Sequence, residues 1–422
     1  MKALVLGGGG REHALVRALA QDTDVTSLHC APGNPGTSQL AENHVVNVTD
    51  PVAVRELARR IRADLVVIGP EAPLVAGVAD EFRRGGMPCF GPDREAARLE
   101  GSKAFAKDVM RAAGIPTARS RTCDTTAQAR EAFAEFGRPY VVKDDGLASG
   151  KGVLVTDDAT AAERHAHRLD RVVVEEYLDG PELSLFALSD GTNVVPLLPA
   201  QDFKRAFDND EGPNTGGMGA YTPVAWAPND LVAETMESIV TPTVREMARR
   251  GVPYQGVLYV GLALTENGPR VVEFNARFGD PEAQVVLDRL ATPLGRLLQA
   301  SATGGLSGQT MVDWHPGAAV TVVVAAEGYP DSPALGDLVT GIDAATAVSD
   351  AYVLHAGTAW SGLSDLKAAG GRVLNVVGTG SDLAAARNAA YTAADHIDLR
   401  GSFYRSDIAA RAISMTEEHG PS

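Results

Sequence analysis

Short apolar runs alternate with amphipathic segments along the first ninety residues. The apolar runs predict strands over Lys2–Leu6, Val25–Cys30, Val45–Val48, Leu65–Ile68 and Pro88–Phe90. Apolar residues at helical spacing predict helices over Glu12–Ala20, Pro51–Arg62 and Val75–Arg84. Strands that alternate with helices in this way are typical of a parallel, doubly wound α/β sheet with helices on both faces.

The glycine run Gly7–Gly10 separates the first predicted strand from the first predicted helix. Glycines at such a junction let backbone N–H groups approach an anion, which the helix dipole also favours. A dinucleotide site fits poorly, because the third glycine of GxGxxG is missing and the second strand ends in His29–Pro32 without an acidic residue. The turn-forming loops Pro32–Gly36 and Gly69–Pro73 follow two strands, where open α/β sheets bind ligands. We therefore favour a site for a small phosphorylated substrate over ordinary turns.

A predicted hairpin carries a lysine among glycines in its loop. The strand Tyr140–Lys143 runs into the loop Asp144–Gly152, which contains Lys151, and Val153–Val155 resumes strand character. This loop is not of the Walker A type, because no helix follows the lysine. The pattern fits a lid that closes over phosphates, and it would also fit a plain hairpin with surface lysines.

Two segments flank the hairpin. Ser102 is placed to cap a helix over Lys103–Ala113. The apolar strand Val172–Val174 runs into the carboxylates Glu175 and Glu176, a pattern that fits either a nucleotide-binding hinge between domains or a solvated strand end.

A third polar cluster lies within Val271–Glu282. Glu273 and Asn275 project from one face of the predicted strand, because side chains alternate along a strand. Arg277 lies one step further, and a turn can hold Asp280 nearby. Carboxylate and amide oxygens beside a guanidinium suit Mg²⁺ bound to phosphate, although an edge strand with solvated polar residues would show the same pattern.

Composition limits the function classes. The 422 residues are 45% hydrophobic and 22% charged, which predicts a globular chain of two to four domains. The net charge of −16 argues against nucleic-acid or membrane partners, so any anion site must be local. Cys30, Cys89 and Cys123 show no paired spacing and are expected to be buried thiols in a reducing cytoplasm. No secretory signal or run of 18 apolar residues is visible, which favours a cytoplasmic location.

The C-terminal region predicts a small α+β domain. Strands are expected over Ala318–Ala326, Val353–His355 and Val373–Val377, with a helix over Leu383–Ile397. His355 is expected to be a strand-end residue rather than a catalyst, and the other eight histidines are expected to form no ligand cluster.

These motifs together resemble a known family. Their order resembles the ATP-grasp fold and, more closely, the phosphoribosylamine–glycine ligase family, whose members are also called glycinamide ribonucleotide synthetases. The resemblance extends through Gly7–Ala14, Pro32–Asn34, Gly69–Glu71, Val142–Lys143, Gly150–Val153, Gly212–Tyr221 and Glu273–Asn275. The runs Pro213–Tyr221 and Glu273–Glu282 are highly specific.

The resemblance implies four parts in a monomer. They are an N-terminal substrate domain (1–101), a large ATP-grasp subdomain (102–120 and 190–325), a small lid subdomain (121–189) and a C-terminal domain (326–422).

The resemblance also implies an activity and residue roles. Enzymes of this family join glycine to 5-phosphoribosylamine in purine synthesis, through a glycyl phosphate, and convert ATP to ADP and phosphate. The implied ATP contacts are Lys103, Lys143, Lys151, Glu175, Glu176, Leu178 and Glu182. The implied ligands of Mg²⁺ or Mn²⁺ are Glu273 and Asn275. The implied substrate contacts are Gly9, Gly10, Arg11, Asn34, Gly36, Glu71, Pro73, Lys204, Asp208, Asp210, Asn214, Thr215, Gly216, Arg277 and Asp280, with Lys151, Arg277 and Asp280 also catalytic.

The chain departs from the family pattern twice. Phe203 stands where the family usually has histidine, and Ala409 stands where a glycine is expected, which we interpret as a packing change. Two alternatives remain at this point. One is another ATP-grasp ligase, such as a phosphoribosyl-aminoimidazole carboxylase or a formate-dependent glycinamide ribonucleotide enzyme, which would lack the Gly212–Tyr221 run. The other is a nucleotide sensor, which would not need both metal ligands.

Overall fold

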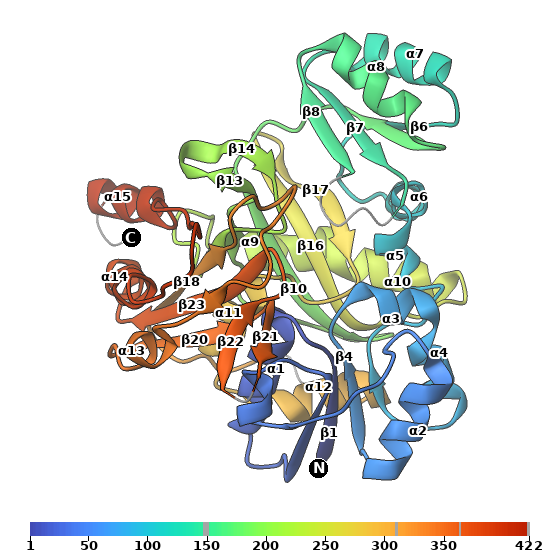
Figure 1. Cartoon of the computed structure of the whole chain (residues 1–422). Helices are drawn as coiled ribbons and strands as arrows, with labels where there is room; N and C mark the ends of the chain where they lie inside the picture. Colours follow the sequence, from blue (N-terminus) through green and yellow to red (C-terminus); the bar gives the residue numbers. More distant parts are fainter. Residues whose placement is uncertain (147–151, 309–310, 363, 420–422) are drawn as a thin grey trace.

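The computed structural model describes residues 1–146, 152–308, 311–362 and 364–419. Figure 1 shows the N-terminal sheet in blue, a central sheet in green and yellow, a small teal subdomain that projects away from it, and a C-terminal part in orange and red. Lys151, a predicted lid residue, lies outside the described residues.

The N-terminal sheet is parallel, with the strand order β3-β2-β1-β4-β5. Its strands are β1 (Lys2–Gly7), β2 (Ser27–Pro32), β3 (Glu42–Asn43), β4 (Leu65–Ile68) and β5 (Cys89–Phe90). Its helical elements are α1 (Gly10–Ala20), η1 (Thr37–Gln39), α2 (Pro51–Ile61), α3 (Glu71–Ala76), α4 (Val78–Arg84) and α5 (Arg98–Gly101). Along β1, Ala3 and Val5 pack in the core that includes α1, whereas Leu4 and Leu6 pack with α2 and α4. Helices therefore cover both faces, and the predicted doubly wound sheet is confirmed.

Two predicted elements of this region are wrong. Val45–Val48 is not a strand in the structure; the edge strand β3 is Glu42–Asn43, and Val45 is fully exposed. The helix expected over Val75–Arg84 is divided, because Gly77 has φ +83°, a left-handed conformation that ends α3 before α4 begins.

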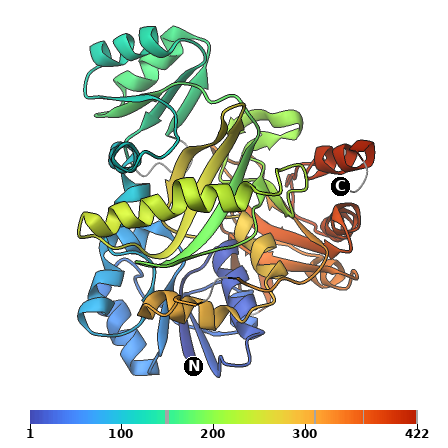
Figure 2. The ribbon, with the colours of Figure 1, turned by 180° about the vertical axis from the view of Figure 1, so that it is seen from behind.

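The central sheet is antiparallel, with the order β11-β10-β16-β17. Its strands are β10 (Glu182–Asp190), β11 (Val194–Pro196), β16 (Gln255–Thr265) and β17 (Gly268–Asn275). The accompanying helices are α6 (Lys103–Ala113), α9 (Leu231–Thr235), η3 (Met236–Val240), α10 (Thr241–Arg249), α11 (Glu282–Arg289) and α12 (Leu294–Thr303). The expected cap of α6 is present, since Ser102 Oγ accepts a hydrogen bond from the Phe105 N–H at 3.1 Å. Figure 2 shows α9, η3 and α10 as one long helix across the back of this sheet.

The projecting subdomain contains the predicted hairpin. Its elements are β6 (Ser120–Cys123), α7 (Thr126–Phe136), β7 (Tyr140–Asp144), β8 (Val153–Thr156), α8 (Ala159–His167) and β9 (Val172–Glu175). The strands form an antiparallel sheet in the order β6-β9-β7-β8, in which Lys143 on β7 is paired with Val153 on β8.

The C-terminal part is built on an antiparallel sheet with the order β12-β15-β18-β23-β20. These strands are β12 (Gln201–Asp202), β15 (Gly219–Thr222), β18 (Ala318–Ala325), β20 (Ala351–His355) and β23 (Arg372–Gly380). The other elements are β13 (Arg205–Phe207), η2 (Asp208–Asp210), β14 (Glu211–Asn214), β19 (Leu338–Val339), α13 (Ile342–Thr346), β21 (Thr358–Ser361), β22 (Asp365–Ala368), α14 (Leu383–Ala394) and α15 (Ala410–His419). Because β18 pairs with β23 along its whole length, the domain limit expected after residue 325 separates two strands of one sheet.

Cys30, Cys89 and Cys123 are free and buried, as expected. Burial raises the pKa of Cys30 and of Cys89 to about 12. Among the helices of the described residues, none combines the length and apolar character that a membrane crossing requires.

Candidate active site

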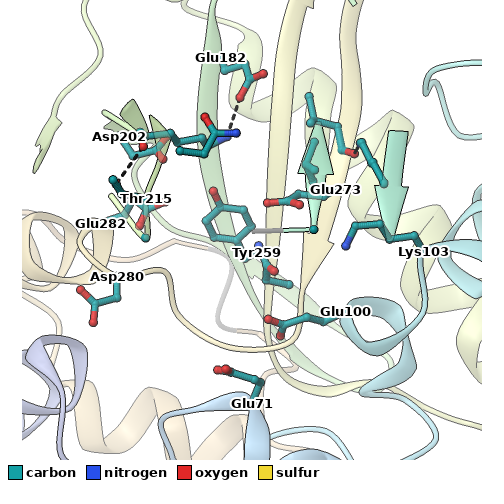
Figure 3. A pocket seen from close by; sticks show the side chains of 18 of the residues that line it. Glu71, Glu100, Lys103, Glu182, Asp202, Thr215, Tyr259, Glu273, Asp280 and Glu282 are labelled. Carbon is teal, nitrogen blue, oxygen red and sulfur yellow. Dashed lines mark hydrogen bonds and ion pairs between the residues drawn. The ribbon is translucent and has the colours of Figure 1, made fainter. Parts of the chain in front are cut away.

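A cavity of about 590 Å³ lies where the N-terminal sheet, the central sheet and the hairpin subdomain meet (Figure 3). Many of the residues expected in the site line it: Arg11, Glu71, Lys103, Lys143, Glu175, Glu176, Leu178, Glu182, Lys204, Asn214, Thr215, Gly216, Glu273, Asn275, Arg277 and Asp280. The cavity is therefore rich in charged groups of both signs.

Glu273 and Asn275 lie two residues apart on β17 and both line the cavity. Within the part of the chain that the structure describes, no hydrogen bond or ion pair involves either side chain. Burial raises the pKa of Glu273, but Lys204, Lys103 and other nearby cations outweigh that effect and hold it below its usual value. An ionised carboxylate and an amide oxygen without protein partners match the donors that Mg²⁺ takes, so this pair fits the predicted metal.

Glu175, at the end of β9, is enclosed between two lysines. Its carboxylate lies 3.0 Å from Lys143 Nζ and 3.1 Å from Lys107 Nζ. Lys143 also donates to the Val272 carbonyl at 2.8 Å. Burial lowers the pKa of Lys107 to about 8, although Glu175 counteracts this effect. The Glu175 carboxylate is thus paired with two lysines at the wall of the cavity, and its expected contact with adenine and ribose stays a prediction.

The other hinge carboxylates also have protein partners. Glu176 accepts the backbone N–H of Arg119 at 3.0 Å and lies 3.2 Å from Arg270. Glu182 lies 2.6 Å from Lys204 Nζ, the contact marked in Figure 3. Of the expected hinge residues that line the cavity, Leu178 is the apolar one.

Lys204 occupies an acidic environment. Its ammonium is close to Asp202, Glu182 and Glu273, which together hold its pKa well above the usual value despite burial. Burial raises the pKa of Asp202 to about 7, although Lys204 opposes the shift. Asp202 titrates near neutrality and was not among the expected site residues.

Arg277 is held by carboxylates of the N-terminal region. Its NH2 atom lies 3.1 Å from Glu100, and its Nε atom lies 3.8 Å from Glu71. Glu100 is itself fixed, because it accepts the Ala276 N–H at 2.8 Å. Nε of Arg277 is buried and has no hydrogen-bond partner in the described residues, and the Glu71 carboxylate at 3.8 Å is its ion-pair contact.

Asp280 lies at the junction of three segments. Its carboxylate accepts Gln284 Nε2 at 2.9 Å and the Arg11 N–H at 3.4 Å, and Arg372 NH2 lies 3.4 Å away. Burial raises the pKa of Asp280, but Arg372 and Arg11 lower it more, so the carboxylate is ionised at neutral pH. Arg372, which the sequence analysis missed, comes from β23 in the C-terminal part.

The glycine-rich loop that follows β14 lies against the same arginine. Arg372 NH1 donates to the Gly217 carbonyl at 3.3 Å and to the Asp280 carbonyl at 2.6 Å. Tyr329 OH accepts the Gly216 N–H at 3.0 Å. Gly217 has φ +110°, and a Cβ there would lie 2.4 Å from Pro281, so the loop requires glycine. The C-terminal part therefore helps to close the cavity.

Several expected substrate residues do not line this cavity: Gly9, Gly10, Asn34, Gly36, Pro73, Asp208 and Asp210. The Gly9 N–H already donates to Glu12 Oε2 at 2.7 Å, so a side chain occupies part of the expected anion loop. Asn34 Nδ2 donates to the Gly8 and His355 carbonyls, each at 2.9 Å, and so joins two domains.

Asp208 and Asp210 bind the C-terminal segment instead. Asp208 accepts the Ser406 N–H at 2.8 Å, and Asp210 lies 2.8 Å from Arg405. The carboxylates therefore hold the β13–β14 hairpin to residues that follow α14.

The structure also brings in residues without an expected role. Five of them line the cavity: Glu100, Asp202, Tyr259, Glu282 and Arg372. The sixth, Lys107, contacts the lining residue Glu175. Lys107 lies one helical turn after Lys103 in α6, a spacing that could have identified it. Ser184 Oγ and Tyr259 OH lie 2.7 Å apart, and Ser184 donates to Glu282 at 3.2 Å, an interaction between β10, β16 and α11 that sequence spacing does not reveal.

Family models match this chain along most of its length. The phosphoribosylglycinamide synthetase N domain matches residues 1–100, its ATP-grasp (A) domain matches 101–283 and its C domain matches 319–411. The chain belongs to the phosphoribosylglycinamide synthetase family. The C-domain match begins near the start of β18, the strand that pairs with β23, and the domain limit expected after residue 325 stays a prediction.

Individual relatives of this synthetase family span the whole chain. A phosphoribosylamine–glycine ligase of Streptomyces coelicolor is 62% identical over 414 residues, which are 98% of this chain and 99% of the relative. One from Mycobacterium tuberculosis is 54% identical over 421 residues, 98% of each chain. The crystal structure of phosphoribosylamine–glycine ligase from Thermotoga maritima has a TM-score of 0.84 and 35% identity, and covers 97% of this chain and 100% of that one. The predicted family and α/β ATP-grasp fold are confirmed, and ATP-dependent ligation is the activity of this family.

Proposed function

We propose that the chain joins glycine to 5-phosphoribosylamine in the cavity, with ATP converted to ADP and phosphate. The observation that carries the proposal is the pair Glu273 and Asn275, which line the cavity together with Lys103 and whose side chains have no protein partner in the described residues. The family match over all three domains supports the choice of substrates. An enzyme that activates a carboxylate with ATP needs a metal-binding site and cationic side chains next to the transferred phosphoryl group.

Glu273 and Asn275 would hold Mg²⁺, which when bound would offset charge on the ATP phosphates. Lys103 and Lys143 line the cavity, and we assign them, with Lys151, to the ATP phosphates. Glycine carboxylate is a weak nucleophile that the γ-phosphate repels, so neutralisation and alignment account for most of the catalysis. The described cavity therefore needs no side-chain nucleophile.

In the proposed first step, an oxygen of the glycine carboxylate attacks the γ-phosphorus and ADP leaves. Arg277 orients the glycine carboxylate, because its guanidinium is cationic and lines the cavity. Asp280 is ionised and holds the glycine ammonium. In the second step, the amine of phosphoribosylamine attacks the carbonyl carbon of glycyl phosphate, loses a proton and expels phosphate.

We assign the sugar phosphate to the side of the cavity formed by the N-terminal sheet, where Arg11 and Glu71 line the wall. Asn34 and Gly36 would act indirectly, by holding the loop between the N-terminal sheet and β20. We also propose that the enzyme works as a monomer in the cytoplasm and accepts Mg²⁺ or Mn²⁺. Light scattering and activity with each metal alone would test those assignments.

The decisive experiment measures ADP release with ATP, Mg²⁺, glycine and phosphoribosylamine, omitting each component in turn. We expect turnover only in the complete mixture, and mass spectrometry should identify glycinamide ribonucleotide. ADP release at the same rate without glycine or without phosphoribosylamine would contradict the proposal.

A further inference from the structure

Two histidines and a glutamate converge at the edge of the N-terminal sheet, outside the cavity. His29 Nδ1 lies 3.0 Å from His44 Nε2 and 3.6 Å from Glu42 Oε2. His44 Nε2 lies 3.8 Å from Glu42 Oε1. The three side chains therefore bring two imidazole nitrogens and a carboxylate together, and the expectation that the histidines form no ligand cluster is wrong.

Strand register explains the convergence. His29 on β2 is the direct partner of Glu42 on the parallel strand β3. Glu42 and His44 lie two residues apart and so project to the same side. The His44 N–H donates to the Cys30 carbonyl at 2.8 Å, which extends the backbone pairing just beyond β3.

The spacing is that of a metal coordination shell. Zn²⁺ binds imidazole nitrogen and carboxylate oxygen at about 2.0–2.2 Å in a tetrahedron, so its ligand atoms lie roughly 3.3–3.5 Å apart. The two imidazole nitrogens lie 3.0 Å apart, and His29 and His44 lie 3.6 and 3.8 Å from the two different carboxylate oxygens of Glu42, distances close to this value. The shortest separation also matches a hydrogen bond between the two histidines, and strand register brings the Glu42 carboxylate to the same place.

The surroundings favour one histidine tautomer. Ser27 Oγ lies 3.0 Å from His29 Nε2 and can accept its N–H, which leaves the Nδ1 lone pair directed at the cluster. The positive charge of Lys2 would repel a metal ion bound beside His29. The negative charge of Glu42 would offset this repulsion.

We propose that His29, Glu42 and His44 form a Zn²⁺ site with three protein ligands and a fourth position open to water. The site would secure β3 to β2. Asn43 follows Glu42 and donates to the Asn34 carbonyl at 2.9 Å, and Asn34 in turn reaches the His355 carbonyl. Bound zinc would thus stabilise the contact between the N-terminal and C-terminal parts without taking part in catalysis.

Isothermal titration of the full-length protein with ZnCl₂ tests the proposal, with excess Mg²⁺ present to occupy the cavity. We expect one Zn²⁺ per chain with micromolar or tighter affinity, a higher melting temperature with zinc, and visible absorption of a tetrahedral Co²⁺ complex. Glu42→Gln and His44→Asn should each weaken zinc binding by at least about 10-fold. His315→Asn is the matched control, because His315 is exposed and belongs to no cluster of metal ligands in the described residues.

Turnover by Glu42→Gln should stay within about twofold of the parent, since Glu42 lies outside the cavity and is 70% exposed at its side chain. Because Glu42 is exposed, Glu42→Gln should fold like the parent protein. The test therefore remains valid even if His44→Asn fails to fold. Zinc binding that is unchanged in both cluster variants, or absent from the parent protein at millimolar ZnCl₂, would overturn the proposal.

Discussion

The ammonium of Lys143 lies 3.0 Å from the carboxylate of Glu175, and both side chains are buried. Lys107 contacts the other carboxylate oxygen, so the single negative charge of Glu175 is shared between two cations at the cavity wall. Glu175→Gln would leave the two ammonium groups without their shared counter-charge, and we expect it to cost about 3–5 kcal/mol of unfolding free energy. Urea unfolding followed by circular dichroism measures this loss.

Glu163→Gln is the matched control for that experiment, because Glu163 pairs with Arg130 at the surface of the same subdomain, 2.9 Å away. Glu163→Gln should lower the free energy of unfolding far less than Glu175→Gln, because water screens an exposed ion pair. Equal effects of the two substitutions would show that the buried ion pairs contribute no more than a surface pair.

Glu273→Ala should reduce turnover at least about 100-fold while the protein remains folded. The side chain makes no hydrogen bond or ion pair with the described protein, so its removal costs little stability but takes away a proposed metal ligand. The ADP-release assay over a range of Mg²⁺ concentrations measures the effect. Glu266→Ala removes an exposed carboxylate from the turn of the same hairpin and should be neutral. Full activity of Glu273→Ala at ordinary Mg²⁺ would exclude the metal assignment.

Arg372→Ala should raise KM for glycine or phosphoribosylamine more than KM for ATP. Arg372 binds the Asp280 carbonyl and the Gly216–Gly217 loop, so its loss would disorder the substrate side of the cavity and leave the lysines intact. We expect kcat/KM to fall by about 10-fold or more in Arg372→Ala and to recover in part in Arg372→Lys. Arg400→Ala, which removes an exposed partner of Asp337, serves as the control. A change confined to KM for ATP would contradict this role.

Stability should fall steeply below pH 6.5 because of the histidine pair His13 and His355. The His355 N–H donates to His13 Nδ1 at 2.8 Å. Burial lowers the pKa of His13 to about 3 and that of His355 to about 4. The folded state keeps both rings neutral, whereas both histidines of the unfolded chain bind protons below about pH 6.5. The free energy of unfolding is therefore highest above that pH and decreases as the pH falls toward about 4.

The expected slope is about 1.4 kcal/mol per pH unit for each histidine. Unfolding by urea at several pH values between 7.5 and 4.5 would measure it. The comparison with His355→Gln isolates the effect, since carboxylates contribute equally to both proteins. Parallel stability curves for the parent and the variant would rule out this source of acid sensitivity.

Local pattern was sufficient for most elements. The strand at Leu65–Ile68 and the helix Lys103–Ala113 have their predicted bounds, because an apolar run between turn residues and a capped amphipathic run are local signals. The strand predicted at Val45–Val48 fails, because β-branched residues favour a strand only when a partner strand and a core lie beside them. Ala409 shows a similar limit: its departure from glycine was interpreted as packing, yet the residue has φ +63°, a backbone conformation that normally favours glycine.

The sequence by itself determined the fold class, the family and the metal-binding pair Glu273 and Asn275 as a candidate, because strand alternation and contiguous motifs are encoded within a few residues. Only the tertiary structure decided which charges meet. Arg372 on β23 contacts Asp280, which precedes α11, and strand register brings His29 next to His44. Such contacts depend on how separate strands and helices are packed, and electrostatic effects depend on the resulting distances and burial rather than on distance along the chain.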